Sequence, residues 1–275
     1  MFADDSEINA KHVHRRGLHH LVAMAAVAFT GDGMTRYSMT MRNVRTHLGV
    51  PTNCELKWSP ANGSWLKTPE GNRARPMLRR AMLHAAIEAG ARSVTVIYDR
   101  TGDEPVDQVR AKVMRYLYDK VSLHLANSGG KALMIADEPG GGGEARRTWL
   151  AASRELTQVG TPFTAPEWIG LPIMACPSDH LEHLQLADLI AGATTAAVAG
   201  NPHALELRDD LAQLADRNRA GRLGGAGVTL WPPRLVDLYW WLWDEPLYGR
   251  RGYLMKLGPQ SAPMSWRTFQ TSPGV

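Results

Sequence analysis

The segment Gln185-Leu186-Ala187-Asp188-Leu189-Ile190-Ala191-Gly192 places one carboxylate in the middle of an otherwise apolar helix. Mostly small residues follow it as far as Gly200. Because a buried charge without a partner is costly, Asp188 is expected to pair with another group or to bind a metal ion. Gln185 and Gly192 share its helical face, since they lie three residues before it and four after it. The alternative is a solvated aspartate at the helix surface, paired with an arginine.

The composition is ordinary for a globular protein of 275 residues, with 44% hydrophobic residues and a formal net charge of +4. This mild positive charge is compatible with a polyanionic partner but does not identify one. The two cysteines, Cys54 and Cys176, are far apart and form no CxxC motif. Their spacing argues against a disulfide framework or a zinc ribbon and favours a cytoplasmic location.

Apolar runs alternate with amphipathic segments along the first 200 residues. Strands are expected at 1–4, 21–29, 93–98, 131–136 and 171–175. Helices are expected at 75–89, 105–127, 144–159 and 181–199, and the segment 34–48 fits a strand or a helix equally well. This alternation predicts an α/β fold with a mostly parallel or mixed sheet covered by helices. We expect no membrane span, because the run 21–29 is too short and Asp188 interrupts the longest apolar helix.

The composition changes after Gly200, so we expect a core domain at 1–200 and a C-terminal helical, Trp-rich appendage at 201–275, packed on the core. A charged helix at 205–220 is followed by a glycine-rich loop and an aromatic segment. These aromatic side chains could stack on nucleic-acid bases, but packing in a core or an oligomer interface is favoured. They are Trp231, Tyr239, Trp240, Trp241, Trp243 and Tyr248.

Four acidic residues fall where a chain can deliver side chains into one cleft: Asp4, Glu55, Asp137 and Asp188. Side chains at the carboxyl ends of strands converge in open α/β sheets. Carboxylate oxygens are the ligands that hard divalent cations prefer. Two such ions about 4 Å apart can stabilise the attacking and the leaving oxygen of a phosphodiester displacement. We therefore predict a site for Mg²⁺ or Mn²⁺, with Asp99 as the main rival ligand because it also ends a strand.

The order of these motifs resembles the domain-of-unknown-function 3800 family. The resemblance lies in Phe2-Ala3-Asp4-Asp5-Ser6-Glu7, Glu55-Leu56-Lys57, Ile135-Ala136-Asp137-Glu138 and Gln185 to Gly192, and it covers the chain before Gly200. It implies a ribonuclease H-like fold, a mixed sheet flanked by helices, with the acids placed as in metal-dependent nucleases and integrases. It also implies a role in antiviral (phage) defence or in a mobile genetic element.

The resemblance assigns roles residue by residue. Asp4, Glu55, Asp137 and Asp188 match the family's acids and would be both catalytic residues and metal ligands. Lys57 and Gln185 match polar companions; Lys57 would assist electrostatically or form an ordinary salt bridge, and Gln185 would orient a ligand or the substrate.

The motif around the first strand departs from the family's usual Asp-Glu-Ser-Gly. Here it is Asp4-Asp5-Ser6-Glu7, and Glu7 stands where glycine would free the backbone. Asp5, Ser6 and Glu138 are interpreted as supporting residues. Because adjacent residues of a strand point to opposite faces, one acid of each neighbouring pair is expected to point away from the site.

Other conspicuous features are interpreted as structural. The histidines and basic residues at 11–20 are expected to form a mobile basic surface loop. The segment 139–143 lacks the Gly-Lys-Ser/Thr ending of a phosphate-binding loop, so a flexible loop beside the site is expected. The arginines at 73, 75, 79 and 80 are interpreted as a solvated helix face, and His183, with Asp179 and His180, as covering a helix start.

The sequence therefore predicts a metal-dependent nuclease acting on DNA or RNA. A first alternative is a non-catalytic nucleic-acid or protein-binding subunit of a defence or mobile-element complex. A second is the hydrolysis of a nucleotide or another small phosphoester, which needs the same acids in a closed pocket. A protein partner or a second copy of the chain is expected to bind through the Trp-rich C-terminal region.

Overall fold

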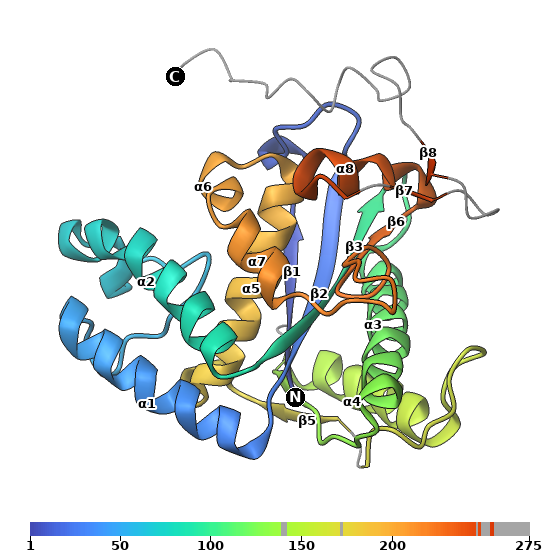
Figure 1. The fold of residues 1–275 in the computed structure, drawn as a ribbon, viewed down its shortest axis with the longest axis horizontal. Helices are drawn as coiled ribbons and strands as arrows, with labels where there is room; N and C mark the ends of the chain where they lie inside the picture. The colour runs from blue at the N-terminus through green and yellow to red at the C-terminus, as the bar shows by residue number, and fades with distance from the viewer. Residues whose placement is uncertain (139–141, 171–172, 246, 249–253, 256–275) are drawn as a thin grey trace.

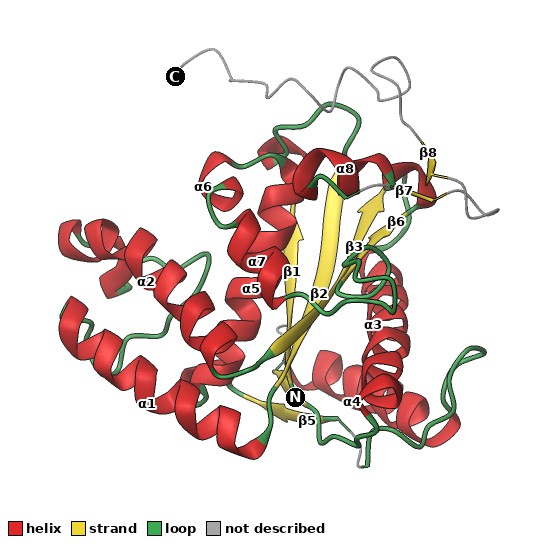
Figure 2. Cartoon of the chain, in the orientation of Figure 1, coloured by secondary structure: helices red, strands yellow, loops and turns green. Residues whose placement is uncertain are grey.

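A six-stranded mixed sheet crosses the centre of the molecule (Figure 2). The structure is a computed structural model that describes residues 1–138, 142–170, 173–245, 247–248 and 254–255. The strands are β1 (Phe2–Ile8), β2 (His20–Ala28), β3 (Arg92–Arg100), β4 (Ile135–Asp137), β5 (Met174–Cys176) and β6 (Val228–Trp231). Their order is β5-β4-β1-β2-β3-β6, with β2 antiparallel to both of its neighbours and the other pairs parallel. With the helices on both faces, this confirms the expected α/β class with a mixed sheet.

Helices cover the two faces of the sheet (Figure 1). One face carries α1 (Gly31–Leu48), α2 (Pro69–Glu88) and α5 (Glu182–Ala199), and the other carries α3 (Val106–Ser128) and α4 (Gly142–Val159). Successive side chains of strand β2 point to opposite faces of the sheet. Val22 and Met24 pack in the core with α3, whereas Ala25 and Val27 pack in the core with α5. Each face therefore has its own apolar core.

Local capping explains why residues 31–48, which fitted two structures in the sequence, form helix α1. The Thr30 hydroxyl accepts a hydrogen bond from the backbone N–H of Gly33, and Gly49 ends the helix in the left-handed conformation with φ 65°. Helix α2 begins earlier than the expected Arg75, because Thr68 caps it in the same way and Pro69 occupies its first position.

The expected strand at 131–136 is shorter in the structure, since β4 begins at Ile135 and Ala132 makes only an isolated bridge to Ile169. The expected strand at 171–175 corresponds to β5, and residues 171–172 lie outside the described residues. Within the described chain, no helix is long and apolar enough to cross a membrane.

The chain after Gly200 adds both helices and strands. Its helices are α6 (Pro202–Leu205), α7 (Arg208–Leu214) and α8 (Asp237–Trp243), and its short hairpin is β7 (Leu247–Tyr248) with β8 (Leu254–Met255). The single helix expected at 205–220 is wrong, because α7 ends at Leu214 and the chain then turns toward β6. This segment was expected to be helical, yet β6 pairs with β3 and extends the central sheet.

The aromatic residues of this segment mostly pack inside the protein. Tyr239 is buried, and its hydroxyl accepts from Leu230 N at 2.9 Å and donates to Val228 O at 3.0 Å. Trp241 and Trp243 pack against the same apolar cluster, whereas Trp240 is 42% exposed. The packing interpretation is thus confirmed for Tyr239, Trp241 and Trp243; the side chain of Tyr248 lies outside the described residues.

Candidate acidic site

The four predicted acids come from separate parts of the chain and converge on the α5 face of the sheet. Strand β1 pairs with β4 in the register Phe2↔Ile135 and Ala3↔Ala136, so the next position brings Asp4 beside Asp137. Helix α5, which carries Asp188, packs against β1. The charges of Asp188 and Asp137 act on Asp4, and the charge of Glu55 acts on Asp188. The structure therefore brings the acids together in one electrostatic cluster.

Asp4 is the most deeply buried member of this cluster, with only 5% of its surface exposed. Its Oδ1 accepts a hydrogen bond from the backbone N–H of Asp5 at 2.7 Å, while its Oδ2 has no partner among the described residues. Burial, followed by repulsion from Asp188, Asp137 and Asp5, raises the pKa of Asp4 to about 9. Asp4 Oδ2 is therefore available to bind a proton, to accept a hydrogen bond or to coordinate a cation.

Asp188 is held by the segment that follows Glu55. The backbone N–H of Trp58 donates to Asp188 Oδ2 at 2.6 Å. Partial burial raises the pKa of Asp188 to about 6, against the opposing effects of this hydrogen bond and of Lys57. A Cβ atom at Gly192 would lie 2.6 Å from the Cβ of Trp58, so only glycine lets the Trp58 segment approach helix α5 this closely. Gly192 is therefore the point at which the Trp58 segment comes closest to the helix.

Gln185 fastens the segment 54–58 to helix α5. Its Oε1 accepts from Leu56 N at 3.0 Å and from the Arg45 guanidinium at 3.2 Å. Its Nε2 donates to Ser178 O at 3.0 Å. We expected Gln185 to orient a ligand or the substrate; all these contacts are to protein groups, so in this structure it positions Glu55 by holding the adjacent backbone.

Lys57 lies between two of the acids. Its Nζ is 3.1 Å from Glu55 Oε1 and 3.9 Å from Asp137 Oδ2. Although partial burial lowers it, the surrounding carboxylates raise the pKa of Lys57 above its ordinary value. Glu55 has a second partner, because the Ser178 hydroxyl donates to its Oε1 at 2.7 Å. The position of Lys57 beside two carboxylates means that its ammonium group balances part of the negative charge of the cluster.

The supporting residues divide between the two faces of the sheet. Asp5 and Glu7 point away from Asp4 and contact Arg110, at 3.7 and 2.8 Å, on the α3 side. The expectation that one acid of the pair Asp4-Asp5 points away is confirmed. Ser6 shares the face of Asp4 by strand alternation. Glu138 contributes its backbone N–H, which donates to Asp137 Oδ1 at 2.9 Å.

The departure at Glu7 does not disturb the first strand. Strand β1 continues through Glu7 to Ile8, so this position is extended and needs no glycine. The Glu7 carboxylate also lies 2.7 Å from His20 Nε2 on the neighbouring strand. Glu7 therefore belongs to a polar network on the opposite face of the sheet from Asp4.

The rival acid Asp99 lies away from this cluster. It pairs across the sheet with Leu21, whereas Asp4 pairs with Ala25. Asp99 itself is 1% exposed, whereas the residues 101–103 that follow it form an exposed turn. Its carboxylate accepts from His19 N at 2.8 Å and pairs with the Arg234 guanidinium, which makes it a fastening point for these two segments.

Two other expectations need correction. Arg15 does not lie in a mobile surface loop, since it is 5% exposed and its Nε donates to Val198 O at 3.0 Å near the end of α5. Arg79 was assigned to a solvated helix face, yet it is only partly exposed, lies 3.7 Å above the Trp58 ring and donates to Trp58 O at 2.6 Å. Trp58 and Ser178 were not among the predicted site residues, and no residue pattern marks Ser178.

His183 is partly buried at the start of α5, where its ring packs against those of Phe2, Phe29 and Tyr37, in agreement with its interpretation as a residue that covers a helix start. Its ring stacks on Phe2 with a centroid distance of 4.7 Å, and burial lowers its pKa. The glycine-rich segment 139–143 was expected to be a loop beside the site; its residues 139–141 lie outside the described residues.

The acidic side chains of the cluster have the chemistry to bind a hard divalent cation, but their arrangement in this structure does not form a metal site. In the described part of the chain, no three or more histidine, cysteine, aspartate or glutamate side chains are arranged to hold a metal ion. The carboxylate oxygens are suitable ligands. Asp4 Oδ2, which has no hydrogen-bond partner among the described residues, is available to coordinate a cation. Lys57 stands between Glu55 and Asp137, so both could ligate an ion only after its ammonium group moves.

Comparison of the chain with protein-family models, with curated protein sequences and with solved structures gave no match. The resemblance carried by the sequence motifs, and the ribonuclease H-like fold that it implies, therefore stay predictions. The position of the acids rests on the geometry of this chain alone.

Proposed function

We propose that the chain is a metal-dependent nuclease that hydrolyses phosphodiester bonds at Asp4, Glu55, Asp137 and Asp188. The observation that carries this proposal is the convergence of the four carboxylates from β1, the segment 54–58, β4 and α5. Carboxylates that repel one another are best reconciled by a bound cation. The order β3-β2-β1-β4-β5, with β2 antiparallel, is compatible with the ribonuclease H-like arrangement that the motifs suggest.

The chain's own residues would divide the work as follows. Asp4, Glu55, Asp137 and Asp188 would hold Mg²⁺ or Mn²⁺, which when bound supplies an activated water and stabilises the leaving oxygen. Lys57 would then leave Glu55 and Asp137, and its ammonium group would pair with a phosphate oxygen. Arg79, held over Trp58, would add positive charge beside Asp188. Gln185 would keep the Glu55 segment in place.

A cleaving site on an open surface is favoured over a closed pocket for a nucleotide. The side chains of Lys57, Glu55 and Asp137 keep 30%, 34% and 20% of their surface exposed. This exposure favours a polymer lying across the acids over a small phosphoester enclosed in a pocket.

One observation supports a second function. Lys57 pairs with Glu55 and with Asp137, so two of the four acids have a counter-charge without any metal. A non-catalytic nucleic-acid or protein-binding subunit of a defence or mobile-element complex would keep this ion-pair network unchanged. Metal dependence separates the two functions.

The nuclease proposal is tested with labelled single-stranded and double-stranded DNA and RNA in the presence of Mg²⁺, Mn²⁺ or EDTA. Cleavage by the wild-type protein should need the metal. Asp188→Asn should reduce the rate by about a hundredfold or more, because one of the charged ligands is lost. The matched control is Asp5→Asn, which removes a charge from the opposite face of the sheet and should keep the activity.

Binding of the metal is measured separately by thermal unfolding. A ligand that binds only the folded state raises the melting temperature, so Mn²⁺ should stabilise the wild-type protein and Asp5→Asn but not Asp188→Asn. A folded protein that neither cleaves any of the four substrates nor gains stability from Mn²⁺ would contradict the nuclease and leave the binding subunit.

A further inference from the structure

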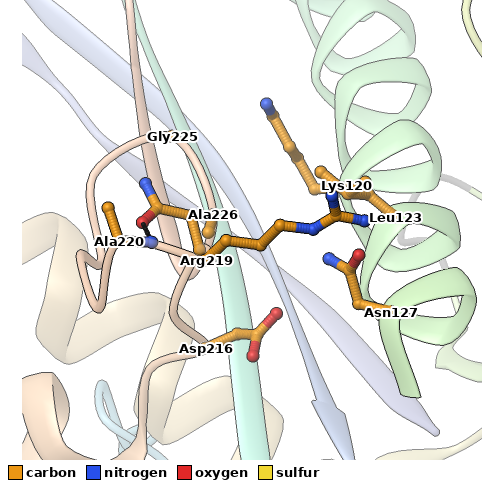
Figure 3. Close-up of a pocket in the computed structure, with 9 residues that line it drawn as sticks. Lys120, Leu123, Asn127, Asp216, Arg219, Ala220, Gly225 and Ala226 are labelled. Atoms are coloured by element: carbon orange, nitrogen blue, oxygen red, sulfur yellow. Dashed lines mark hydrogen bonds between the residues drawn. The ribbon is translucent and has the colours of Figure 1, made fainter.

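A pocket lies between helix α3 and the loop that precedes β6 (Figure 3). Its volume is about 390 Å³, within the range of about 300–1,000 Å³ that is usual for small-molecule sites. Lys120, Leu123 and Asn127 of α3 form one wall, and residues of the segment 216–226 form the other. Because α3 covers the opposite face of the sheet from α5, the pocket is separate from the acidic site.

Two cations without ion pairs face this pocket. The Arg219 side chain extends from the loop toward α3, and Lys120 lies on the facing wall (Figure 3). Among the described residues, neither the partly buried Lys120 nor the exposed Arg219 makes a hydrogen bond or an ion pair. Burial lowers the pKa of Lys120, against the opposing effect of the charge of Asp119. A partly buried ammonium group that makes no ion pair is stabilised when an anion binds beside it.

The acid in the described lining balances at most one of these two positive charges. Asp216, the one acidic side chain among the described lining residues, pairs with His124 at a distance of 3.0 Å between Oδ2 and Nδ1. Its backbone N–H donates to Ser93 O at 2.8 Å, which fixes the start of the loop against β3. The pocket therefore keeps an excess of positive charge.

The loop that presents Arg219 is preorganised. The side-chain oxygen of Asn218 accepts from Ala220 N at 2.9 Å and from Arg222 N at 3.1 Å. The backbone N–H of Asn218 donates to Arg222 O at 2.8 Å, which closes the turn. Since its oxygen is occupied, the Asn218 side chain can offer only N–H donors to a ligand. A preformed loop reduces the entropy lost on binding.

We propose that this pocket binds a small organic phosphate, a phosphomonoester whose organic group is about the size of a nucleoside. Lys120 and Arg219 would pair with the phosphate oxygens, a geometry for which the guanidinium fork is well suited. Leu123, which is 48% exposed, and Ala226 would contact the organic group. This inference does not depend on the nuclease proposal.

The test is isothermal titration calorimetry of the full chain with AMP, phenyl phosphate, adenosine and inorganic phosphate. AMP and phenyl phosphate should bind, and adenosine, which lacks the anion, should bind at least about tenfold more weakly. Lys120→Met and Arg219→Met should each weaken AMP binding by about tenfold, because each removes a charge-assisted contact. Lys131→Met, which removes the same charge from an exposed position outside the pocket, is the matched control.

Two results would overturn the proposal. The first is AMP binding that is no tighter than adenosine binding, or that falls equally in Lys120→Met and Lys131→Met. The second is an oligonucleotide that binds through Lys120 while AMP does not bind, which would mean that the pocket contacts a polymer backbone. Thermal unfolding of each variant checks that it is folded. Retained metal-dependent cleavage in Lys120→Met would keep failure of this site distinct from failure of the nuclease.

Discussion

Asp4 and Asp99 are both buried carboxylates on the central sheet, 5% and 1% exposed, but their surroundings are opposite. Asp99 accepts a backbone hydrogen bond from His19 and pairs with the Arg234 guanidinium. Asp4 has one backbone donor, an oxygen without a partner in the described chain, and other carboxylates beside it. Burial by itself therefore does not distinguish the two acids, whereas the balance of charge around each of them does.

The two aspartates also differ in what they hold together. Arg234 donates to Gly17 O at 3.0 Å as well as to Asp99, so Asp99 joins the segment before β2 to the segment after β6. Within the described residues, Asp4 joins no distant segments by a hydrogen bond, since its one donor there is the next residue. We infer that Asp99 stabilises the fold. The buried carboxyl group of Asp4 lowers the stability of the folded protein and instead offers a group that can bind a ligand.

The largest expected effect is on Asp99. Asp99→Asn should lower the free energy of unfolding by about 3 kcal/mol, because it leaves the Arg234 guanidinium without its buried counter-charge. Urea denaturation at pH 7 measures this change. Asp103→Asn, at an exposed turn nearby, should be neutral. A loss below about 1 kcal/mol, the value typical of surface ion pairs, would show that Asp99 is not the fastening point inferred here.

A second prediction concerns the support of the acidic site. Gln185→Leu should lower the free energy of unfolding by about 2 kcal/mol, because Leu56 N loses its acceptor and Ser178 O its donor in a buried position. It should also abolish stabilisation by Mn²⁺, since Glu55 is no longer held. Gln108→Leu, at an exposed position of α3, is the control. Unchanged Mn²⁺ binding in Gln185→Leu would separate Gln185 from the site.

The close packing at Gly192 makes a third, smaller prediction. Gly192→Ala should destabilise the protein by about 1–2 kcal/mol, because the new methyl group would overlap Trp58 and displace its N–H from Asp188. Gly31→Ala is the matched control, since a Cβ at this helical glycine meets nothing within 4 Å. Equal thermal stability of the two variants would contradict the close approach of Trp58 to α5.

The smallest expected effect has the opposite sign. Asp4→Asn should raise the free energy of unfolding by about 1 kcal/mol at pH 7 without metal, because it removes a carboxyl group that folding keeps from ionising. Urea denaturation without metal measures it. A loss of stability would mean that Asp4, like Asp99, has a stabilising partner.

Asp4, together with Asp188, makes the free energy of unfolding depend on pH. Burial and neighbouring acids raise the folded-state pKa of Asp4 to about 9 and burial raises that of Asp188 to about 6, above the ordinary 3.8. Their stabilising contribution is therefore complete below pH 3.8 and is lost as the pH rises toward these folded-state values. Unfolding measured from pH 4 to 9 without metal should show this decline, and Asp4→Asn should make it shallower. An equal slope in both proteins would contradict the raised pKa of Asp4.

The sequence predicted the elements whose information is local. Helix α5 was expected at 181–199 and is found at Glu182–Ala199, because its apolar residues and the terminal Gly200 specify a helix without outside help. Helix α1 was left open between a strand and a helix because its apolar pattern fits both, although the capping residues Thr30 and Gly49 that decide its structure lie beside it in the sequence. Strand β6 was missed, because its four residues form a strand only where β3 supplies the hydrogen-bonding edge.

By itself, the sequence determined the α/β class, the main helices and the set of acids, because periodicity, capping residues and strand-terminal carboxylates are properties of short segments. Only the tertiary structure decided which acids have counter-charges. The partners of Asp99 lie 80 and 135 residues away along the chain, and Ser178 lies 123 residues from Glu55. Electrostatic energy depends on distance in space and on burial, so the distinction between Asp4 and Asp99 arises only when the chain is folded.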